Sequence, residues 1–222
     1  MKNRLTAHEH KIGIITFPIG KASVTPLNNL LGIFSCLMNQ IYVVTGNAGV
    51  DVAHRFRESH FELIDHASGS NLVARIYNYS KTQLTITFRM AKISKYVDIW
   101  IFPICGDALL PCVILAKALR KPVVMSLTSS TEMRKHQSDF LLSVATICTK
   151  INYLLATRII LYSPRLISEW NLEKYRHKIL IAHRHFLDFN TFTVTTPLAD
   201  RPPLIGYIGR LSREKGVQHF AQ

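Results

Sequence analysis

Apolar runs of strand length alternate with helix-like stretches along most of the 222 residues. Within these runs the apolar residues are continuous rather than alternating with polar ones. That pattern is typical of strands whose two faces are both covered, as in a parallel sheet between layers of helices. The expected strands are residues 11–17, 40–45, 61–66, 72–77, 97–103, 122–127, 158–162 and 178–182. The pattern therefore predicts an α/β fold with a Rossmann-like, doubly wound parallel sheet.

The intervening segments predict helices at 25–34, 82–92, 109–119, 138–156 and 166–175. Thr25 is the expected N-cap of the first helix, because Pro26 follows it and suits the first helical position. The segment 82–92 alternates like a strand. We interpret it as a helix, since a parallel sheet needs a crossover before the next strand.

The pattern breaks at residues 195–203, where three of the last seven residues are proline, and then restarts. We interpret 1–194 as one domain, 195–203 as a linker and 204–222 as the first strand, turn and helix of a second domain. A single strand and helix start cannot bury a core. The sequence therefore predicts a truncated second domain with exposed apolar residues in 204–208.

Composition narrows the classes of protein. No apolar run reaches the roughly 20 residues that span a bilayer, and the first ten residues lack the apolar stretch of a secretory signal, so a cytoplasmic location is the default. The net charge of +13 would attract nucleic acid, an anionic membrane or a phosphorylated ligand. No basic run interleaved with aromatic residues is present, which argues against nucleic acid. An anionic membrane surface stays a candidate partner, because the basic charge and the apolar segment 140–162 would both suit a peripheral protein.

Cysteine and histidine residues predict no metal site. Four cysteines lack Cys-x-x-Cys spacing and stand in apolar surroundings, so we expect buried free thiols. The ten histidines do not pair with cysteine or carboxylate at metal-ligand spacing, and surface or packing roles are expected for them.

Loops that follow the strands are the candidate ligand sites, because doubly wound sheets bind ligands beyond the carboxyl ends of their strands. The loop 17–23 lacks both Gly-x-Gly-x-x-Gly and Gly-x-x-x-x-Gly-Lys-Ser/Thr, which argues against a dinucleotide dehydrogenase and a P-loop NTPase. It is either a plain turn or a loop facing a diphosphate or an acceptor, with Gly20 allowing close backbone approach and Lys21 beside it.

Three further loops carry polar residues with two open interpretations each. Asn47 follows the second strand in a Gly-Asn-x-Gly turn and is either a turn residue or a ligand contact. Asp107 follows a buried strand and is either a helix N-cap or a contact to a substrate hydroxyl. Ser129 lies among hydroxyl residues 128–131, which could bind phosphate or sugar, or cap the next helix.

The turn at residues 209–216 joins an apolar strand to a helix start. It contains Gly209, Arg210 and Lys215. Free backbone N–H groups and two cations at one turn suit a diphosphate. The alternative is an ordinary loop between a strand and a helix, in which Arg210 and Lys215 are solvated.

The segment 205–216, Ile-Gly-Tyr-Ile-Gly-Arg-Leu-Ser-Arg-Glu-Lys-Gly, resembles the donor-site signature of family 4 glycosyltransferases of the GT-B type. Segment 181–188 resembles the end of that family's N-terminal domain, although Arg184-His185 replace the usual Asn-Gly. Segment 158–163 is similar to the family's strand ending in serine. The resemblance thus covers nearly the whole chain, as an N-terminal domain plus the edge of a second.

The resemblance implies a two-domain enzyme that transfers a sugar from a nucleotide-sugar donor, with retention, to a glycan or lipid-linked acceptor. The donor is a substrate, and neither a cofactor nor a bound metal is expected. Arg210 and Lys215 would act in catalysis by holding the diphosphate and stabilising the leaving group, with Gly209 and Gly20 beside the phosphates. Loops of the N-terminal domain would hold the acceptor through Lys21, Asn47, Asp107 and Ser129.

Departures from the family pattern qualify the activity. The Glu-x7-Glu element of the second domain is absent, and residues 128–130 stand where the family often has a histidine. The chain as given is expected to be incomplete or inactive as a transferase. The alternatives are a non-catalytic module that binds a phosphorylated or lipid-linked ligand, or one half of a split transferase.

Overall fold

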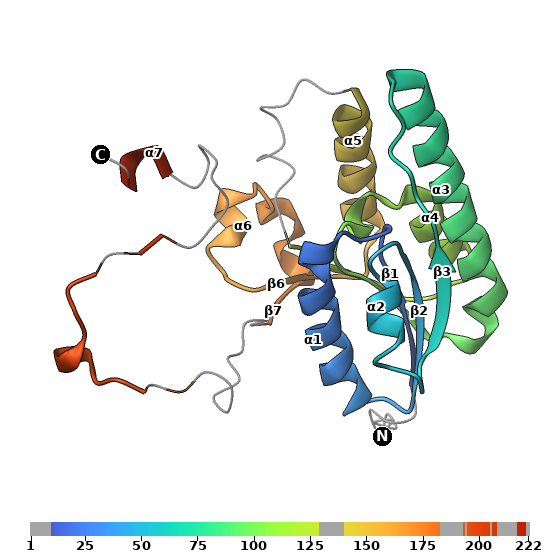
Figure 1. The fold of residues 1–222 in the computed structure, drawn as a ribbon. Coiled ribbons are helices and arrows are strands. Elements are labelled where there is room, and N and C mark those ends of the chain that lie inside the picture. Colours follow the sequence, from blue (N-terminus) through green and yellow to red (C-terminus); the bar gives the residue numbers. More distant parts are fainter. Residues whose placement is uncertain are drawn as a thin grey trace. The chain divides into compact units, whose positions relative to one another are not determined.

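The computed structural model describes residues 10–128, 140–182, 193, 195–204, 206, 207 and 217–220. The chain divides into two compact units, Met1–His183 and Arg184–Gln222. The described part of the first unit contains a parallel sheet of seven strands in the order β3-β2-β1-β4-β5-β6-β7 (Figure 1). Its strands are β1 Lys11–Ile15, β2 Gln40–Gly46, β3 His60–Ile64, β4 Ile99–Phe102, β5 Val123–Ser126, β6 Arg158–Leu161 and β7 Ile179–Ile181. The Rossmann-like α/β fold predicted from the sequence is confirmed.

Helices cover both faces of the sheet. Among the described residues of this unit, the α-helices are α1 Val24–Ser35, α2 Val50–Ala53, α3 Leu72–Ile93, α4 Leu110–Ala118, α5 Phe140–Leu155 and α6 Leu166–Glu169. Helices α3, α4 and α5 pack side by side on one face, and α1 and α2 lie on the other (Figure 1). None of the helices in the described part of the chain is long and apolar enough to span a membrane.

Two apolar cores form because successive side chains of a strand point to opposite faces. On β4, Trp100 belongs to the core under α3, α4 and α5, whereas Ile101 belongs to the core under α1 and α2. On β1, Ile12 and Ile14 face the second core and Ile15 the first. The central strands are therefore buried on both sides, as their continuous apolar sequence predicted.

Gly13 lies between these residues at the centre of the sheet. Its register partner on β4 is Trp100, whose side chain is fully buried. A Cβ atom on residue 13 would lie 2.2 Å from Cζ3 of the Trp100 ring. The indole therefore occupies the space that a side chain on β1 would need, and only glycine fits there.

Helix α3 corrects the sequence interpretation most strongly. Residues 72–77 were expected to form a strand, but they are the first turns of a 22-residue helix. Asn71 caps this helix, since its Oδ1 accepts a hydrogen bond of 2.8 Å from the backbone N–H of Ala74. The β-branched and aromatic residues after the cap favoured a strand locally, but the cap and the packing of the helix on the sheet decide otherwise.

Smaller differences concern helix ends and thiols. Helix α1 begins at Val24 with Ser23 at the N-cap position, so Thr25 is not the cap. Cys112 is buried and Cys148 half-buried, but Cys36 and Cys105 are exposed, which contradicts the expectation of four buried thiols. Burial raises the pKa of the Cys112 thiol to about 12, so it stays protonated and inert at neutral pH.

The second unit contains a short 3₁₀ turn at Leu198–Asp200 and helix α7 Val217–Phe220. Within the predicted strand 204–208, the described residues Leu204, Gly206 and Tyr207 belong to no helix or strand. Leu204 is exposed, as the sequence predicted, but Tyr207 is half-buried, and Ile205 and Ile208 lie outside the described residues.

Candidate functional site

The loops after β1 and β2 are joined to each other at the carboxyl edge of the sheet. The backbone N–H of Ile19 donates to the carbonyl oxygen of Gly46 at 3.1 Å, and the N–H of Ala48 donates to that of Ile19 at 3.1 Å. Below this junction, the buried hydroxyl of Thr16 donates to that of Thr45 at 2.8 Å. The sequence-predicted loops containing Gly20 and Asn47 therefore form one continuous surface.

Gly20 immediately precedes a 3₁₀ turn at Lys21–Ser23, which leads into α1. Its φ of −86° is open to any residue, and a Cβ atom there would meet nothing within 4 Å. The fold itself therefore does not require glycine at this position. Lys21 is exposed beside it, and neither the turn nor the first turn of α1 contains an acidic residue. Together they offer positive potential and open space to an anion.

Asn47 links the loop after β2 to the loop after β3. It adopts a left-handed conformation with φ of 52°. Its Nδ2 donates to the carbonyl oxygen of His66 at 3.0 Å, and its Oδ1 accepts from the His66 backbone N–H at 2.9 Å. The amide of Asn47 thus fixes the position of His66, which the sequence analysis had not selected.

The His66 side chain lies in an aromatic cluster. Its Nδ1 is 2.8 Å from the Thr82 hydroxyl on α3, and its ring meets Phe17 edge-on at 4.8 Å between centroids. Phe17 in turn stacks on Tyr79 at 5.7 Å. Burial lowers the pKa of His66 from its ordinary value, so the imidazole is neutral at pH 7 and able to exchange hydrogen bonds with neutral hydroxyl groups.

A pocket of about 590 Å³ lies beside this cluster, between the end of β3 and helix α3. Most of its lining side chains are polar or charged. They come from the loop after β2, from the end of β3 with its following loop, and from one face of α3: Asn47, Leu63, Ile64, Asp65, His66, Ala67, Asn78, Lys81, Thr82, Thr85 and Arg89. Amides, hydroxyls and charges of both signs around a half-open hollow suit a hydroxyl-rich ligand.

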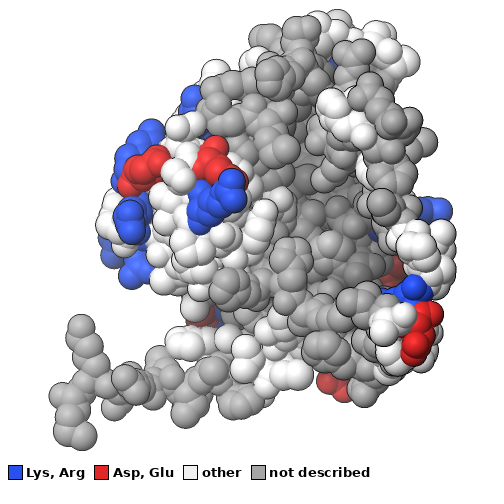
Figure 2. Space-filling view, turned by 90° about the vertical axis from the view of Figure 1, so that its left-hand side faces the viewer, with Lys and Arg blue, Asp and Glu red and all other residues white. Residues whose placement is uncertain are grey.

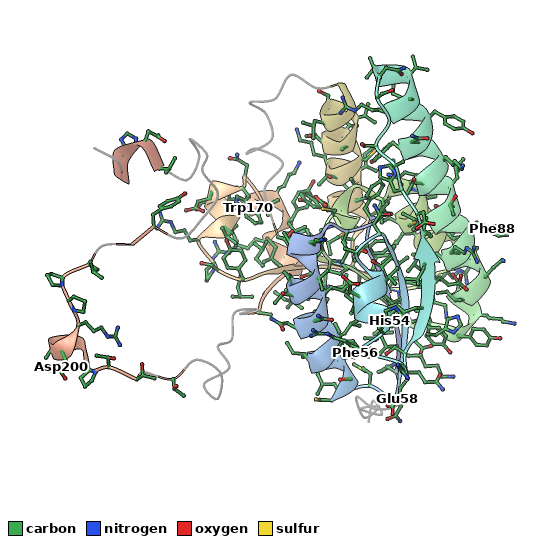
Figure 3. All side chains as sticks on the ribbon, in the orientation of Figure 1. His54, Phe56, Glu58, Phe88, Trp170 and Asp200 are labelled. Atoms are coloured by element: carbon green, nitrogen blue, oxygen red, sulfur yellow. The ribbon has the colours of Figure 1, made fainter. Side chains whose placement is uncertain are left out.

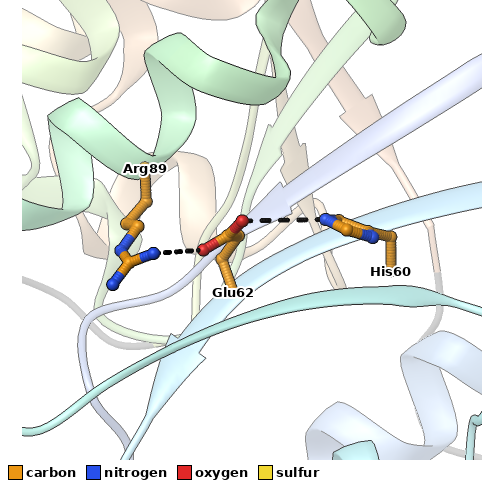
Figure 4. A network of polar contacts seen from close by, with 3 residues as sticks. All are labelled: His60, Glu62 and Arg89. Atoms are coloured by element: carbon orange, nitrogen blue, oxygen red, sulfur yellow. Dashed lines mark hydrogen bonds and ion pairs between the residues drawn. The ribbon is translucent and has the colours of Figure 1, made fainter.

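Two cations contribute to this pocket in different ways. Arg89 is held by Glu62 of β3, with Nη1 and Oε2 2.9 Å apart, and His60 approaches the other carboxylate oxygen at 3.7 Å (Figure 4). Lys81 is exposed and has no ion-pair partner among the residues that the structure describes. Lys81 is therefore the cation of the pocket that a ligand can engage without breaking an existing pair.

Asp107 is not a helix N-cap. It lies inside a 3₁₀ turn at Gly106–Ala108, and the N-cap position of α4 is Leu109. The side chain is buried near α5, where the Thr149 hydroxyl is 3.5 Å from Oδ2, and the Asn152 amide donates to the Asp107 carbonyl oxygen at 2.9 Å. These contacts tie the loop after β4 to α5.

The remaining predicted residues, Ser129, Gly209, Arg210 and Lys215, lie outside the described residues. Within the described parts of the chain, no group of three or more histidine, cysteine or carboxylate residues lies close enough to hold a metal ion.

The sequence did contain a signal for the pocket. Asn78, Lys81, Thr82, Thr85 and Arg89 follow one another at helical spacing, which places them on one face. Interpreting 72–77 as a strand hid this polar face. Its position beside β3 follows only from the fold.

Comparisons with known proteins support the fold. No protein-family model matches the chain, and no curated protein matches its sequence. Among solved structures, a UDP-N-acetylglucosamine 2-epimerase superposes on 78% of this chain and 47% of its own, with 12% identity and a TM-score of 0.54.

Two further solved structures superpose similarly. A UDP-glucosyltransferase from Polygonum tinctorium that is capable of glucosylating indoxyl matches 86% of this chain and 56% of its own, with 9% identity and a TM-score of 0.57. HepE from Anabaena, in complex with UDP and glucose, matches 82% of this chain and 46% of its own, with 14% identity and a TM-score of 0.55. The chain spans about half the length of these proteins. At such identities the likeness shows the fold, a Rossmann-like domain of the type found in GT-B proteins.

Proposed function

We propose that this chain is the acceptor-side half of a nucleotide-sugar-dependent glycosyltransferase of the GT-B type. The carrying observation is the polar pocket beside the joined loops after β1 and β2, at the edge of the sheet where such folds bind ligands. The fold likeness to proteins described with UDP or UDP-sugars supports the same conclusion.

In the proposed reaction, an acceptor hydroxyl forms a bond to the anomeric carbon of the donor sugar. The bond from that carbon to the nucleoside diphosphate breaks, and the acceptor proton is lost. Negative charge develops on the leaving diphosphate, and Arg210 and Lys215 would stabilise it, with Gly209 at the turn. The open space at Gly20 and the unopposed charge of Lys21 support a phosphate position beside that loop. Retention of configuration is part of this proposal and follows from the family resemblance.

The acceptor side of the proposal centres on the pocket. Lys81 and Thr85 supply a free cation and a hydroxyl, while Asn47 holds the pocket wall through His66. Asp107 fixes the loop after β4 through its contacts with α5. A contact from Ser129 to the acceptor stays a prediction. We place the reaction in the cytoplasm, with a glycan or a lipid-linked acceptor at the inner face of the membrane.

Calorimetric titration of the full chain with UDP, GDP and their sugars tests the donor half of the proposal. We expect binding that Arg210→Ala and Lys215→Ala each weaken at least about tenfold, since each removes one charge-assisted contact to the diphosphate. Lys174→Ala is the matched control, because Lys174 is an exposed cation of the 3₁₀ segment Glu173–Lys178, outside the proposed site, and should change nothing. Equal losses in all three variants would refute a specific diphosphate site.

A transfer assay with the same donors separates the transferase from the alternatives. Lys81→Gln should raise the KM for the acceptor and leave donor affinity unchanged, because Lys81 lines the pocket and not the donor loop. Donor binding without transfer, restored by a separately supplied second domain, would indicate a split transferase. Ligand binding in the pocket without any nucleotide binding would indicate a binding module instead.

A further inference from the structure

Helix α3 exposes an apolar stripe on the side away from the sheet. Val73, Tyr77, Leu84 and Phe88 are 77%, 65%, 65% and 60% exposed. At about 100° per residue these four positions fall within roughly 60° of one another on the helix, and the stripe runs for about 22 Å. The buried side chains of α3, among them Ile86, lie on the opposite side of the helix. Phe88 points away from the body of the domain (Figure 3).

The neighbouring helices repeat this arrangement. Ile114 of α4 is exposed, and so are Ile147, Ile151 and Leu154 of α5, which recur at helical spacing. All three helices bury their other sides in the same core. Their exposed apolar side chains therefore belong to the outer surface of one layer. Four apolar side chains on α3, each more than half exposed, amount to roughly 500 Å², which is in the range of the largest apolar patch on a typical monomer, and such a patch is often functional.

The charged residues of these three helices have a single sign, although Arg89 is paired with Glu62 of β3. The sequences of α3, α4 and α5 contain no aspartate or glutamate, but they contain six basic residues: Arg75, Lys81, Arg89, Lys92, Lys117 and Lys150. The segment after α3 adds Lys95. Lys92 lies over the Phe88 ring at 4.7 Å, and Lys95 over the Tyr96 ring at 4.8 Å, so cations adjoin exposed aromatic rings.

Elsewhere on the domain the two signs are mixed. Figure 2 views the molecule from the side of α6, where acidic side chains stand beside basic ones. There Arg165 pairs with Glu169 at 2.6 Å. The combination of exposed apolar residues with unmixed positive charge is thus a property of the α3–α4–α5 layer and not of the whole basic chain.

We propose that the outer face of α3, α4 and α5 docks on an anionic lipid surface. Apolar side chains at a helix surface insert at the boundary between head groups and acyl chains, while flanking lysines contact anionic head groups. A second copy of the chain fits less well, because a two-fold contact would bring the same positive face against itself. The proposal does not depend on the transferase activity.

Co-sedimentation of the full chain with vesicles tests this surface. Phosphatidylcholine vesicles containing about one third phosphatidylserine should bind the chain, and phosphatidylcholine alone should bind it far more weakly. Lys92→Gln with Lys95→Gln should lower partitioning about fivefold per lysine, which corresponds to about 1 kcal/mol for each basic residue near the surface. Leu84→Gln with Phe88→Gln should lower partitioning at least about tenfold, since both substitutions remove apolar area that would insert at the boundary with the acyl chains.

Matched controls lie on the other layer of the domain. Ile33→Gln with Leu37→Gln removes side chains of α1 and its following turn that are 46% and 44% exposed, and should leave partitioning unchanged. Arg55→Gln with Arg57→Gln removes two exposed charges near α2 and should have a smaller effect than the lysine pair.

Three outcomes would overturn the proposal. One is an equal loss of vesicle partitioning in the lysine double variant and in the arginine double variant, which would mean that net charge alone attracts the chain to the vesicles. Another is unchanged binding after Leu84→Gln with Phe88→Gln, with the fold verified by circular dichroism. The third is a stable dimer in sedimentation velocity that this apolar pair dissociates, which would assign the face to a second copy.

Discussion

Gly13→Ala should destabilise the domain far more than an added methyl group usually does. The new Cβ would lie 2.2, 2.3 and 2.9 Å from Cζ3, Cε3 and Cη2 of Trp100, whereas carbon atoms in contact are about 3.5–4.0 Å apart. The indole is fully buried and would have to move by more than about 1 Å in a packed core. Overpacking costs about 1–3 kcal/mol, and the upper end applies here.

A small gain opposes this cost. Replacing glycine in a strand by alanine reduces the entropy lost on folding by about 0.5–1 kcal/mol. The net loss in the free energy of unfolding is therefore about 2–2.5 kcal/mol. For a chain of this size that corresponds to a Tm lowered by about 4–10 °C. Urea unfolding followed by far-ultraviolet circular dichroism measures it, with an unchanged m-value as the sign of an unchanged fold.

A double-mutant cycle isolates the cause. Trp100→Leu alone should cost about 2–4 kcal/mol through the cavity it leaves, but it removes the ring that the new methyl group strikes. Gly13→Ala should then cost almost nothing in that background, giving a coupling of about 2 kcal/mol. Gly32→Ala is the matched control, because a Cβ there meets nothing within 4 Å, and helix α1 should gain about 0.5–1 kcal/mol. Equal costs of Gly13→Ala in both backgrounds would refute the reasoning.

Three further predictions concern polar contacts of single side chains. Lys178→Met should cost about 1–2 kcal/mol, because Lys178 Nζ donates to the last carbonyls of α5, that of Leu154 at 2.9 Å. Burial lowers the pKa of Lys178. The stability of the wild type should therefore rise as pH increases from the folded-state pKa of Lys178 to about 10.5. Denaturant midpoints measured over this pH range should show the rise for the wild type and not for Lys178→Met. Because the pKa of His66 is lowered on folding, its contribution to the free energy of unfolding is complete above pH 6.5 and is lost as pH falls through the folded-state pKa. The stability of His66→Gln should therefore fall less steeply at acid pH than that of the wild type, and identical acid profiles of the two proteins would contradict this. Asn71→Ala removes the cap of α3 and should cost about 1 kcal/mol in urea unfolding, with Asn71→Asp close to wild type.

Helix α3 shows where interpretation from the sequence failed. Residues 72–77 are rich in the residue types that favour strands, and no local rule places them on a helix with certainty. Their helical state depends on the cap at Asn71 and on burial of one face against the sheet. The same error concealed the polar face that lines the pocket and the exposed apolar stripe next to it.

Asp107 and Asn47 show a related limit. Both were correctly placed at the carboxyl ends of strands, but their partners are distant in sequence. Asn47 bonds to His66, 19 residues away, and the Asp107 carbonyl to Asn152, 45 residues away. Turn chemistry can predict that such side chains are polar loop residues, but it does not specify what they contact.

The sequence by itself determined the α/β class, the positions of the seven strands of the described sheet to within a few residues, and the continuous burial of the central strands. These features follow from local patterns, because a strand covered on both faces must be apolar at every position. Tertiary structure alone decided which loops meet, since strand order in a sheet is a long-range property. It joined the Gly20 and Asn47 loops, set α3 beside β3 to form the pocket, and gathered the apolar and basic residues of three helices onto one face. Each of these depends on contacts between segments that no local pattern brings together.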